Sequence, residues 1–452
     1  MGASSTLPAS GTIRAGRGLR GLDLIGLALI FALALVVLAH DGILSSGITY
    51  SDETEHLRRT MIFARIWRGE FSLDLFATAY GGGIWPPLYP ALMGALEAAF
   101  GLGVPGLRLV NVALVFAGFA LFTRMIDDPR PRLLSLVIPA CFLAGTTTYF
   151  QVRPENLAVL LVGLASTAIA RGRLFRAAKP DRARPLAYAA VGALAGLTCL
   201  THAVFALCAA YLTLLALLDI RRRWMFVAAL LAVAGPYFAV QNSLHTGLVL
   251  FATTAEENLA RNNNPYLRTA PRGEADDQLF AEMERRYADG DRVVYPRPLA
   301  VPASRYEQWL HDENKRRIFK AIALSEIAAD PVGALRRLGE RVVGLLVGDA
   351  CLGDGRYGCI VSGTADRVAY AMLVALGLAG LFAAGRVERH HPRAVSFLVL
   401  CGVLLVPMVL TQGLVRHFVI VLLLGAYGGL FRTCETAREP SVAPGPDARQ
   451  PA

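Results

Sequence analysis

Long apolar runs alternate with short charged stretches along most of the chain. Several runs approach the ~20 apolar residues that a helix needs to cross the hydrocarbon core of a bilayer. Ten candidate runs lie at residues 22–40, 105–125, 132–150, 155–170, 186–201, 202–219, 224–243, 366–385, 394–412 and 414–431. The pattern predicts an all-α polytopic membrane protein.

Basic residues test this layout, because cytoplasmic loops beside membrane spans are enriched in Lys and Arg. Three arginines precede the first run, and every second loop after it is basic. These basic positions are Arg14, Arg17 and Arg20; Arg124, Arg130 and Arg132; Arg171, Arg173, Arg176, Lys179, Arg182 and Arg184; Arg221, Arg222 and Arg223; Arg386, Arg389 and Arg393; and Arg432. The alternation predicts a cytoplasmic N terminus in a multi-pass protein of the bacterial cytoplasmic (inner) membrane.

Two runs need separate treatment. A cleaved signal peptide is the alternative for the first run, but residues 22–39 exceed a usual signal core, so a retained signal anchor is favoured. The run Leu88–Gly101 is too short to cross and contains Glu97. It suits an interfacial or re-entrant segment.

The layout also divides the chain. It predicts a disordered cytoplasmic tail over 1–20, a transmembrane module over 21–244 whose first outside loop is 41–104, an outside lobe over 245–364, C-terminal transmembrane helices over 365–432 and a disordered tail over 433–452. Cys351 and Cys359 fall in the predicted lobe, where a disulfide and two free thiols are equally open.

Helical spacing is visible in the two outside segments. Residues 53–67 predict an amphipathic helix along the membrane surface. Residues 312–329 predict a second helix, which ends at Asp330-Pro331 because the residue before a proline disfavours the helical conformation.

Composition and charge agree with a membrane protein. Of the 452 residues, 54% are hydrophobic and 18% are charged, and the mean hydropathy is +0.46. The net charge of +10 sits in short loops beside the apolar runs, and no motif for nucleic acid accompanies it. No nucleic-acid partner is therefore expected; membrane lipids are.

The candidate chemistry lies at the outside ends of the predicted spans. Asp52 and Glu53 follow the first span, where they read either as the first turn of a helix or as a general base at the depth of a lipid phosphate. Arg153 and Glu155 precede the fourth span, and either pair with each other or meet a phosphate and orient a substrate.

Two further cations lie at the same predicted face. His202 stands between two spans, where it is either a structural donor or a phosphate ligand. Arg416 opens the last span, where an anionic partner would explain an arginine within an apolar run. Carboxylates and cations at one membrane edge suit a phosphate leaving group and an acceptor that must lose a proton.

Four sequence stretches also resemble a known family. They are Asp52-Glu53, Pro86-Pro87-Leu88-Tyr89, the segment from Gly196 to His202 (GLTCLTH), and the segment from Asn258 to Pro265 (NLARNNNP). Their order and spacing resemble the GT-C superfamily, specifically the glycosyltransferase family 39 group. That group includes the protein O-mannosyltransferases and the aminoarabinose transferases that modify lipid A. In this group a lysine or arginine usually stands where His202 does, and a glycine where Arg261 does.

The resemblance implies a GT-C-like bundle of about ten or eleven transmembrane helices with outside juxtamembrane helices and a small lobe. It implies an inverting glycosyltransferase that moves a hexose or pentose from a polyprenyl-phosphate donor to a lipid, polysaccharide or protein acceptor. Asp52 would be the base, with Glu53 and Glu155 assisting. Substrate-binding residues would be Arg153, His202, Arg416, Tyr89 and Asn263. No cofactor is required, although a divalent metal is compatible with the carboxylates.

Two alternatives remain open. A transporter or flippase of lipid-linked sugars would use the same apolar groove, but it predicts mid-span charges and inverted repeats, which the sequence does not display. An inactive relative that serves as a scaffold is the second alternative.

Overall fold

The computed structural model is helical throughout the part of the chain that it describes. Described are residues 21–40, 51–72, 75, 78, 85–145, 151–172, 174, 185–217, 223–246, 255–299, 301–347, 364–390, 397–410 and 415–436. No strand occurs in these ranges. The all-α prediction is confirmed.

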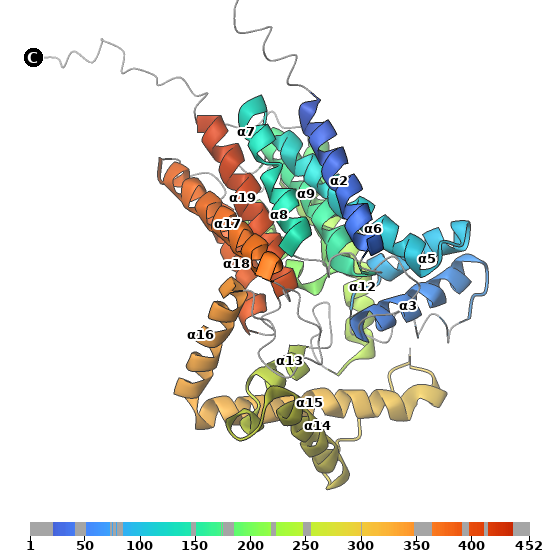
Figure 1. Cartoon of the computed structure of the whole chain (residues 1–452). Helices are drawn as coiled ribbons and strands as arrows, with labels where there is room; N and C mark the ends of the chain where they lie inside the picture. The colour runs from blue at the N-terminus through green and yellow to red at the C-terminus, as the bar shows by residue number, and fades with distance from the viewer. Residues whose placement is uncertain are drawn as a thin grey trace, which may run out of the picture.

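A bundle of helices forms the upper half of the molecule in Figure 1. Its members are α2 (Leu22–His40), α6 (Gly103–Met125), α8 (Val137–Gly145), α9 (Pro154–Gly172), α10 (Pro185–Thr201), α11 (Ala206–Leu217), α12 (Trp224–Leu244), α17 (Thr364–His390), α18 (Phe397–Leu410) and α19 (Val415–Thr436). Each of the ten predicted spans overlaps one of these helices, but α8 covers only nine residues of the predicted span 132–150. Two short helices, α7 (Pro129–Leu134) and η2 (Ala203–Phe205), connect α6 with α8 and α10 with α11.

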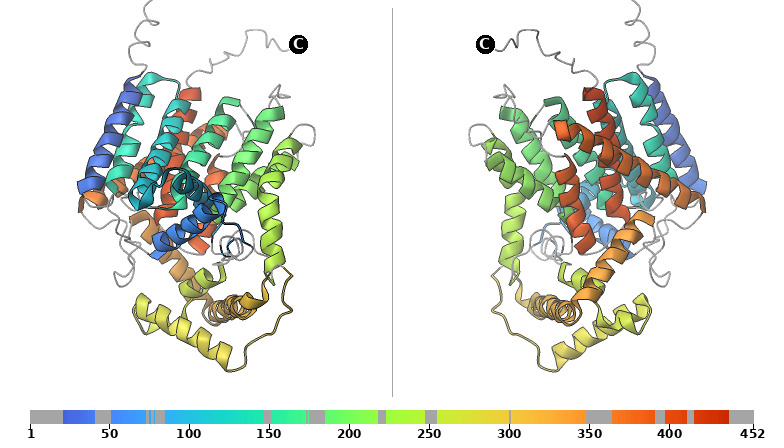
Figure 2. Two further views of the ribbon diagram at one scale, coloured as in Figure 1. Left: turned by 90° about the vertical axis from the view of Figure 1, so that its right-hand side faces the viewer. Right: turned by 90° about the vertical axis from the view of Figure 1, so that its left-hand side faces the viewer.

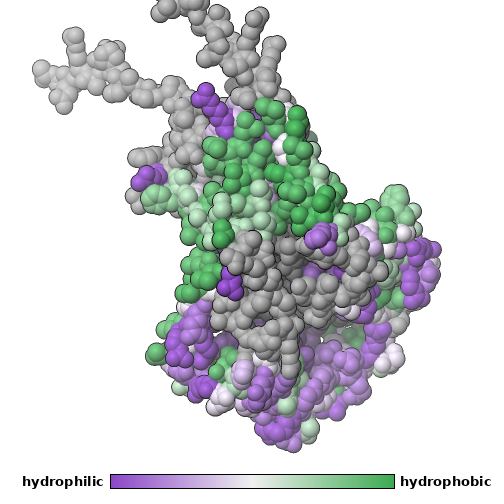
Figure 3. Space-filling model, viewed as in Figure 1, coloured by the Kyte–Doolittle hydropathy of each residue, from purple (hydrophilic) through white to green (hydrophobic). Residues whose placement is uncertain are grey.

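The bundle has the surface of a membrane protein. Four described helices, α2, α6, α12 and the Arg367–Arg386 part of α17, are long and apolar enough to cross a membrane. Leucines on the bundle surface are widely exposed, for instance Leu29 at 66% and Leu231 at 60%. Figure 3 shows hydrophobic residues over the bundle and hydrophilic residues over the opposite half. Such a surface requires lipid around it, and the chain is a multi-pass membrane protein.

Close helix packing holds the bundle together. α17 and α19 approach so closely that a Cβ on Gly380 would lie 2.1 Å from the backbone oxygen of Gly425. In lipid, where the hydrophobic effect does not drive helices together, such backbone contact through small residues is a main source of helix association. α2 begins and α19 ends at the same end of the bundle (Figure 1).

Two helices lie beside the bundle at its opposite end. α3 (Ser51–Trp67) confirms the helix expected over residues 53–67, and α5 (Leu88–Phe100) has 13 residues, which is too short to cross. They pack together through Gly94, where a Cβ would meet the backbone oxygen of Thr60 at 2.8 Å. Figure 1 shows the pair projecting from the bundle on the side that faces the lobe.

A helical lobe lies below the bundle (Figures 1 and 2). It contains α13 (Ala255–Asn262), η3 (Pro265–Arg268), α14 (Arg272–Ala288), η4 (Ala303–Arg305), α15 (Tyr306–Ala329) and α16 (Pro331–Val347). Apolar side chains from α13, α14 and α15 form its core: Ala260, Leu279, Met283, Ile318, Phe319, Ile322 and Ala323. α15 starts six residues earlier than the 312–329 prediction (306 against 312) and ends, as predicted, before Asp330-Pro331. Asp330 then caps α16, because its Oδ1 accepts the backbone N–H of Gly333 at 2.8 Å.

Several predictions fall outside the described residues. They include the tail at 1–20, residues 437–452 of the tail predicted at 433–452, and the pair Cys351 and Cys359. The first four residues of that C-terminal tail were predicted wrongly, because α19 continues to Thr436. The predicted boundaries of the outside lobe stay predictions.

Candidate functional site

A fully buried ion pair joins the first turn of α3 to α6. The Arg108 guanidinium donates from Nε to Glu53 Oε1 at 2.9 Å and from Nη2 to Glu53 Oε2 at 2.7 Å. Both side chains are 0% exposed. This two-point geometry is the strongest that a carboxylate and an arginine form, and it orients both partners.

The same carboxylate also binds the segment that leads into α9. The backbone N–H of Val152 donates to Glu53 Oε1 at 3.0 Å. Glu53 follows Asp52, and Val152 precedes Arg153. The hydrogen bond therefore brings the backbone of the first acidic motif beside the backbone of the Arg153–Glu155 segment, about a hundred residues later in the chain.

A chain of amide hydrogen bonds extends this cluster to α5. Asn111 Nδ2 donates to the backbone oxygen of Gln151, and Tyr89 Oη donates to Asn111 Oδ1 at 2.9 Å. Gln151 Oε1 in turn accepts from Arg153 Nε at 2.9 Å. Tyr89 and Asn111 are 0% exposed, and Gln151 is 3% exposed. α3, α5, α6 and the start of α9 thus share one polar core.

The inward face of α3 supplies two more buried groups. Arg59 is 1% exposed and donates from Nη1 to the backbone oxygen of Trp85 at 2.8 Å. The His56 ring lies 4.6 Å from the Trp85 ring and 5.8 Å from the Tyr89 ring, measured between centroids. These contacts hold the start of α5 against α3.

Electrostatics connects the predicted residues within this core. Burial raises the pKa of Tyr89 well above its ordinary value, the carboxylates of Glu155 and Glu53 raise it further, and Arg153 opposes them. Glu155 is 3% exposed and Arg153 is 5% exposed. Three of the predicted site residues, Glu53, Arg153 and Glu155, therefore lie within electrostatic reach of a fourth, Tyr89.

The first predicted residue, Asp52, is placed by its backbone alone. It lies in the first turn of α3, directly before Glu53, and its side chain is outside the described part of the structure. Arg416 is placed in the same way, near the start of α19 at the end of the bundle that faces the lobe. Their roles stay predictions.

His202 lies at the same end of the bundle, where α10 finishes. Its Nδ1 accepts the backbone N–H of Val204 at 3.3 Å, so the side chain begins the short helix η2. Its ring also meets Phe205, with 6.4 Å between centroids. This geometry gives His202 a structural task in the turn, and its predicted contact with a phosphate is untested.

Asn263 lies in the lobe and not in the membrane-edge cluster. Its Nδ2 donates to the backbone oxygen of Leu259 at 3.0 Å. The adjacent Asn264 donates to Ala275 O at 2.7 Å and accepts from Tyr266 N at 3.0 Å. The asparagine-rich stretch thus shapes the corner between α13 and α14. A substrate contact by Asn263 stays a prediction.

The residue that sequence reasoning missed is Arg108. Its signal was present: a cation three residues inside a predicted span needs a buried anionic partner. The acidic motif on the same side of the membrane offered one, yet nothing in the sequence distinguished Glu53 from Asp52 as that partner.

An apolar cavity lies inside the bundle, between α9, α10, α11, α18 and α19. Its volume is ≈ 180 Å³, and its walls include Ser166, Ile169, Thr198, Phe205, Leu212 and Leu424. Thr198 and Phe205 flank His202 in the chain, at the end of the bundle that faces the lobe. The cavity has the chemistry to hold an alkyl or isoprenoid chain.

No metal site is evident among the described side chains: no three His, Cys, Asp or Glu residues gather there. The compatibility of a divalent metal with the first acidic motif stays a prediction, since the Asp52 side chain is not among them.

Comparisons with known proteins place few limits on the function. No known protein family matches the chain, and no curated protein matches it. Among solved structures, the crystal structure of ArnT from Cupriavidus metallidurans bound to undecaprenyl phosphate is similar to this chain. The two are 16% identical, the match covers 89% of this chain and 77% of the other, and the TM-score is 0.36.

Proposed function

We propose that the protein is an inverting glycosyltransferase that uses a polyprenyl-phosphate sugar at the outer face of the cytoplasmic membrane. One observation carries the proposal. The hydrogen bond from Val152 N–H to Glu53 holds the acidic first turn of α3 against the Arg153–Glu155 segment. A candidate base and a cation for a phosphate are thereby brought to one place at the end of a membrane bundle.

We assign a different role to each carboxylate from its burial and its hydrogen-bond partners. Glu53 is 0% exposed and engaged by Arg108 and Val152, so it acts as the anchor of the site and not as the base. Asp52, the preceding residue, is then the base. Glu155 lies beside Arg153 at the start of α9 and orients the acceptor or the donor.

The chemistry needs a proton acceptor and stabilisation of the leaving group. The acceptor hydroxyl attacks the anomeric carbon while its proton passes to the Asp52 carboxylate. The bond between the anomeric carbon and the phosphate oxygen breaks, and its electron pair leaves with the polyprenyl phosphate. Cations at the membrane edge stabilise that charge, and we assign Arg153, His202 and Arg416 to this task.

The apolar cavity supports a lipid-linked donor. A chain of isoprene units loses water-exposed area when it enters a cavity walled by Ile169, Phe205 and Leu212. Thr198 and Phe205, four and three residues from His202 in the chain, line this cavity, and we therefore assign the headgroup of the bound donor to the neighbourhood of His202. A soluble sugar nucleotide has no lipid chain that could occupy this cavity.

The test is a transfer assay with the purified full chain. Radiolabelled polyprenyl-phosphate sugars are presented with extracted envelope lipids, glycans and proteins, and labelled product is separated from donor. The proposal expects product from at least one donor and none from sugar nucleotides. Movement of the labelled donor across a vesicle bilayer without any transfer would favour a flippase instead.

A further inference from the structure

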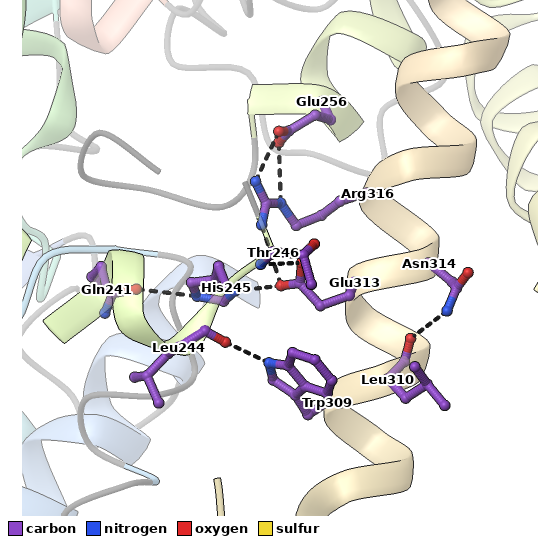
Figure 4. Close-up of polar contacts among 10 residues, drawn as sticks. All are labelled: Gln241, Leu244, His245, Thr246, Glu256, Trp309, Leu310, Glu313, Asn314 and Arg316. Atoms are coloured by element: carbon purple, nitrogen blue, oxygen red, sulfur yellow. Dashed lines mark hydrogen bonds and ion pairs between the residues drawn. The ribbon is translucent and has the colours of Figure 1, made fainter. Parts of the chain in front are cut away.

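The longest lobe helix, α15, grips the end of the membrane helix α12. Trp309, Glu313 and Arg316 lie on one face of α15, at spacings of four and three residues. Figure 4 shows this face turned toward Leu244, His245 and Thr246, which leave α12. This joint connects the lobe to the end of α12.

Glu313 is the centre of the joint. Its carboxylate contacts His245 Nδ1 at 2.5 Å and accepts from Thr246 N at 3.0 Å, Thr246 Oγ1 at 2.5 Å and Arg316 Nη1 at 3.2 Å. The side chain is 1% exposed. A buried carboxylate is stable only when its oxygens are satisfied in this way, and removing it leaves several donors without a partner.

Neighbouring contacts reinforce the joint from both sides. Trp309 Nε1 donates to the backbone oxygen of Leu244 at 2.5 Å, which satisfies one of the carbonyls that the end of a helix leaves open. Arg316 Nη2 reaches Glu256 Oε1 of α13 at 2.9 Å. α12, α13 and α15 are therefore locked to one another.

The N-terminal end of α15 makes a second, separate contact. Arg305, the residue before the helix, donates from Nη2 to Thr78 Oγ1 at 2.6 Å. Thr78 belongs to the connection between α3 and α5. These two helices pack together, and α3 carries Asp52 and Glu53. Arg305 and Glu313 are eight positions apart in the chain, which corresponds to about 12 Å along a helix.

We propose that α15 is a brace that fixes the α3–α5 unit relative to α12, and that Glu313 positions the site by fastening this brace to the bundle. The inference rests on the proposed function for its catalytic consequence. Its mechanical part stands on the contacts of Arg305 and Glu313, both in the N-terminal part of α15. Glu313 acts through α15 and α3 and touches no substrate.

The brace predicts a particular kinetic pattern. Asp52 lies in the first turn of α3, so loosening α3 misplaces the base. The apolar cavity within the bundle, which we assign to the lipid chain of the donor, is unchanged. A misplaced base lowers kcat and leaves KM for the donor nearly constant. A general loss of folded protein would instead lower the active fraction and leave kcat per folded molecule unchanged.

Two variants break the brace at different points. Glu313→Gln removes the charge at the joint, and Arg305→Ala removes the contact with Thr78. Glu307→Gln is the matched control, because Glu307 lies in the same helix with a 73% exposed side chain. Hydrogen–deuterium exchange of the full chain in lipid nanodiscs is followed in peptides from α3, α12 and α15.

Both breaking variants should speed exchange in α3, on the order of tenfold, while the control leaves it unchanged. Only Glu313→Gln should also speed exchange at the end of α12. Unchanged exchange in α3 for Arg305→Ala and Glu313→Gln would overturn the brace, even if activity fell. Faster exchange without a loss of kcat per folded molecule would overturn the positioning role.

A failure of the proposed function can be distinguished from a failure of the brace. If the proposed function is wrong, the unaltered protein transfers no sugar. If the brace is wrong, hydrogen–deuterium exchange in α3 does not change in the variants. The Asp substitution Glu313→Asp, which keeps the charge, should restore part of the protection that Glu313→Gln loses.

Discussion

Glu53 and Glu313 are both almost completely buried, and they are held in different ways. Glu53, at the edge of the membrane bundle, faces a guanidinium that stays charged at any physiological pH. Glu313, at the joint of the lobe, is held by a histidine, a threonine and an arginine that it shares with Glu256. The first arrangement is suited to a permanent anchor, and the second to a contact that can be broken.

The difference changes how acidic residues near membranes should be interpreted. From the sequence, Asp52 was expected to be the base and Glu53 to assist it within one catalytic motif. The structure commits Glu53 to Arg108 and to the backbone of Val152, so the motif contains an anchor beside a candidate base. A deleterious substitution at Glu53 would therefore be no evidence for a catalytic role.

The largest expected effect is on the membrane-edge pair. Arg108→Leu leaves the Glu53 carboxylate buried without its cation, which should destabilise the protein by about 3–5 kcal/mol. The loss of folded protein is measured by size-exclusion chromatography in detergent during a temperature ramp. If Arg108→Leu were combined with Glu53→Met, most of that loss should be recovered; equal instability of the single and double variants would contradict the anchor.

A smaller effect is expected at the lobe. Glu313→Ala removes the acceptor for His245 and Thr246, but water can enter the outside lobe and satisfy these donors. The free energy of unfolding should fall by about 2 kcal/mol. Limited proteolysis between α12 and α15, measured with the bundle intact, reports this change. A loss as large as that of Arg108→Leu would remove the distinction between the two sites.

The lobe should also respond to acid. Burial raises the pKa of Glu313, but hydrogen bonds from His245 and Thr246 outweigh burial and lower the pKa from 4.5 to about 2. A lowered pKa stabilises the folded lobe above pH 4.5, and this stability is lost as pH falls from there toward 2. At pH 4 the loss is about 1 kcal/mol.

Hydrogen–deuterium exchange at the end of α12 measures this response between pH 7 and pH 4. After correction for intrinsic rates, exchange in the unaltered protein should be faster at pH 4. This increase in exchange should be absent in Glu313→Gln, which has no carboxylate to titrate at that position. An identical increase in that variant would assign the response to other groups.

The smallest effect is expected for Glu307→Gln. Glu307 pairs with Arg292 at 2.9 Å, but both side chains are exposed, at 73% and 40%. Ion pairs of this kind contribute less than about 1 kcal/mol, so stability and activity should remain near those of the unaltered protein. A clear loss would show that α15 is more sensitive to surface charge than the brace allows.

Much of the architecture could be predicted from the sequence. The apolar runs and the alternation of basic loops depend on local composition, so each of the ten predicted spans overlaps a helix, although α8 covers only nine residues of the span predicted at 132–150. The end of α15 before Asp330-Pro331 was equally predictable, because proline restricts the residue before it. The direction of α16, which leads from the lobe to the bundle in Figure 1, was not.

The partners within the site were less predictable. Glu53 meets Arg108 55 residues away and Val152 99 residues away, and no local pattern encodes such pairings. The joint of Glu313 with His245 is of the same kind, at a separation of 68 residues. Sequence reasoning gathered carboxylates and cations at one membrane face, but which of them pair depends on tertiary packing.

The central claim is that Asp52, held in place by Glu53, takes the proton of the acceptor. Its most direct measurement compares sugar transfer per folded molecule by Asp52→Asn and by Glu55→Gln, a neighbouring carboxylate in a surface pair with Arg58. We expect Asp52→Asn to lower kcat by about 10³-fold with its folding unchanged, and Glu55→Gln to stay within about twofold. Full transfer by folded Asp52→Asn would contradict the account.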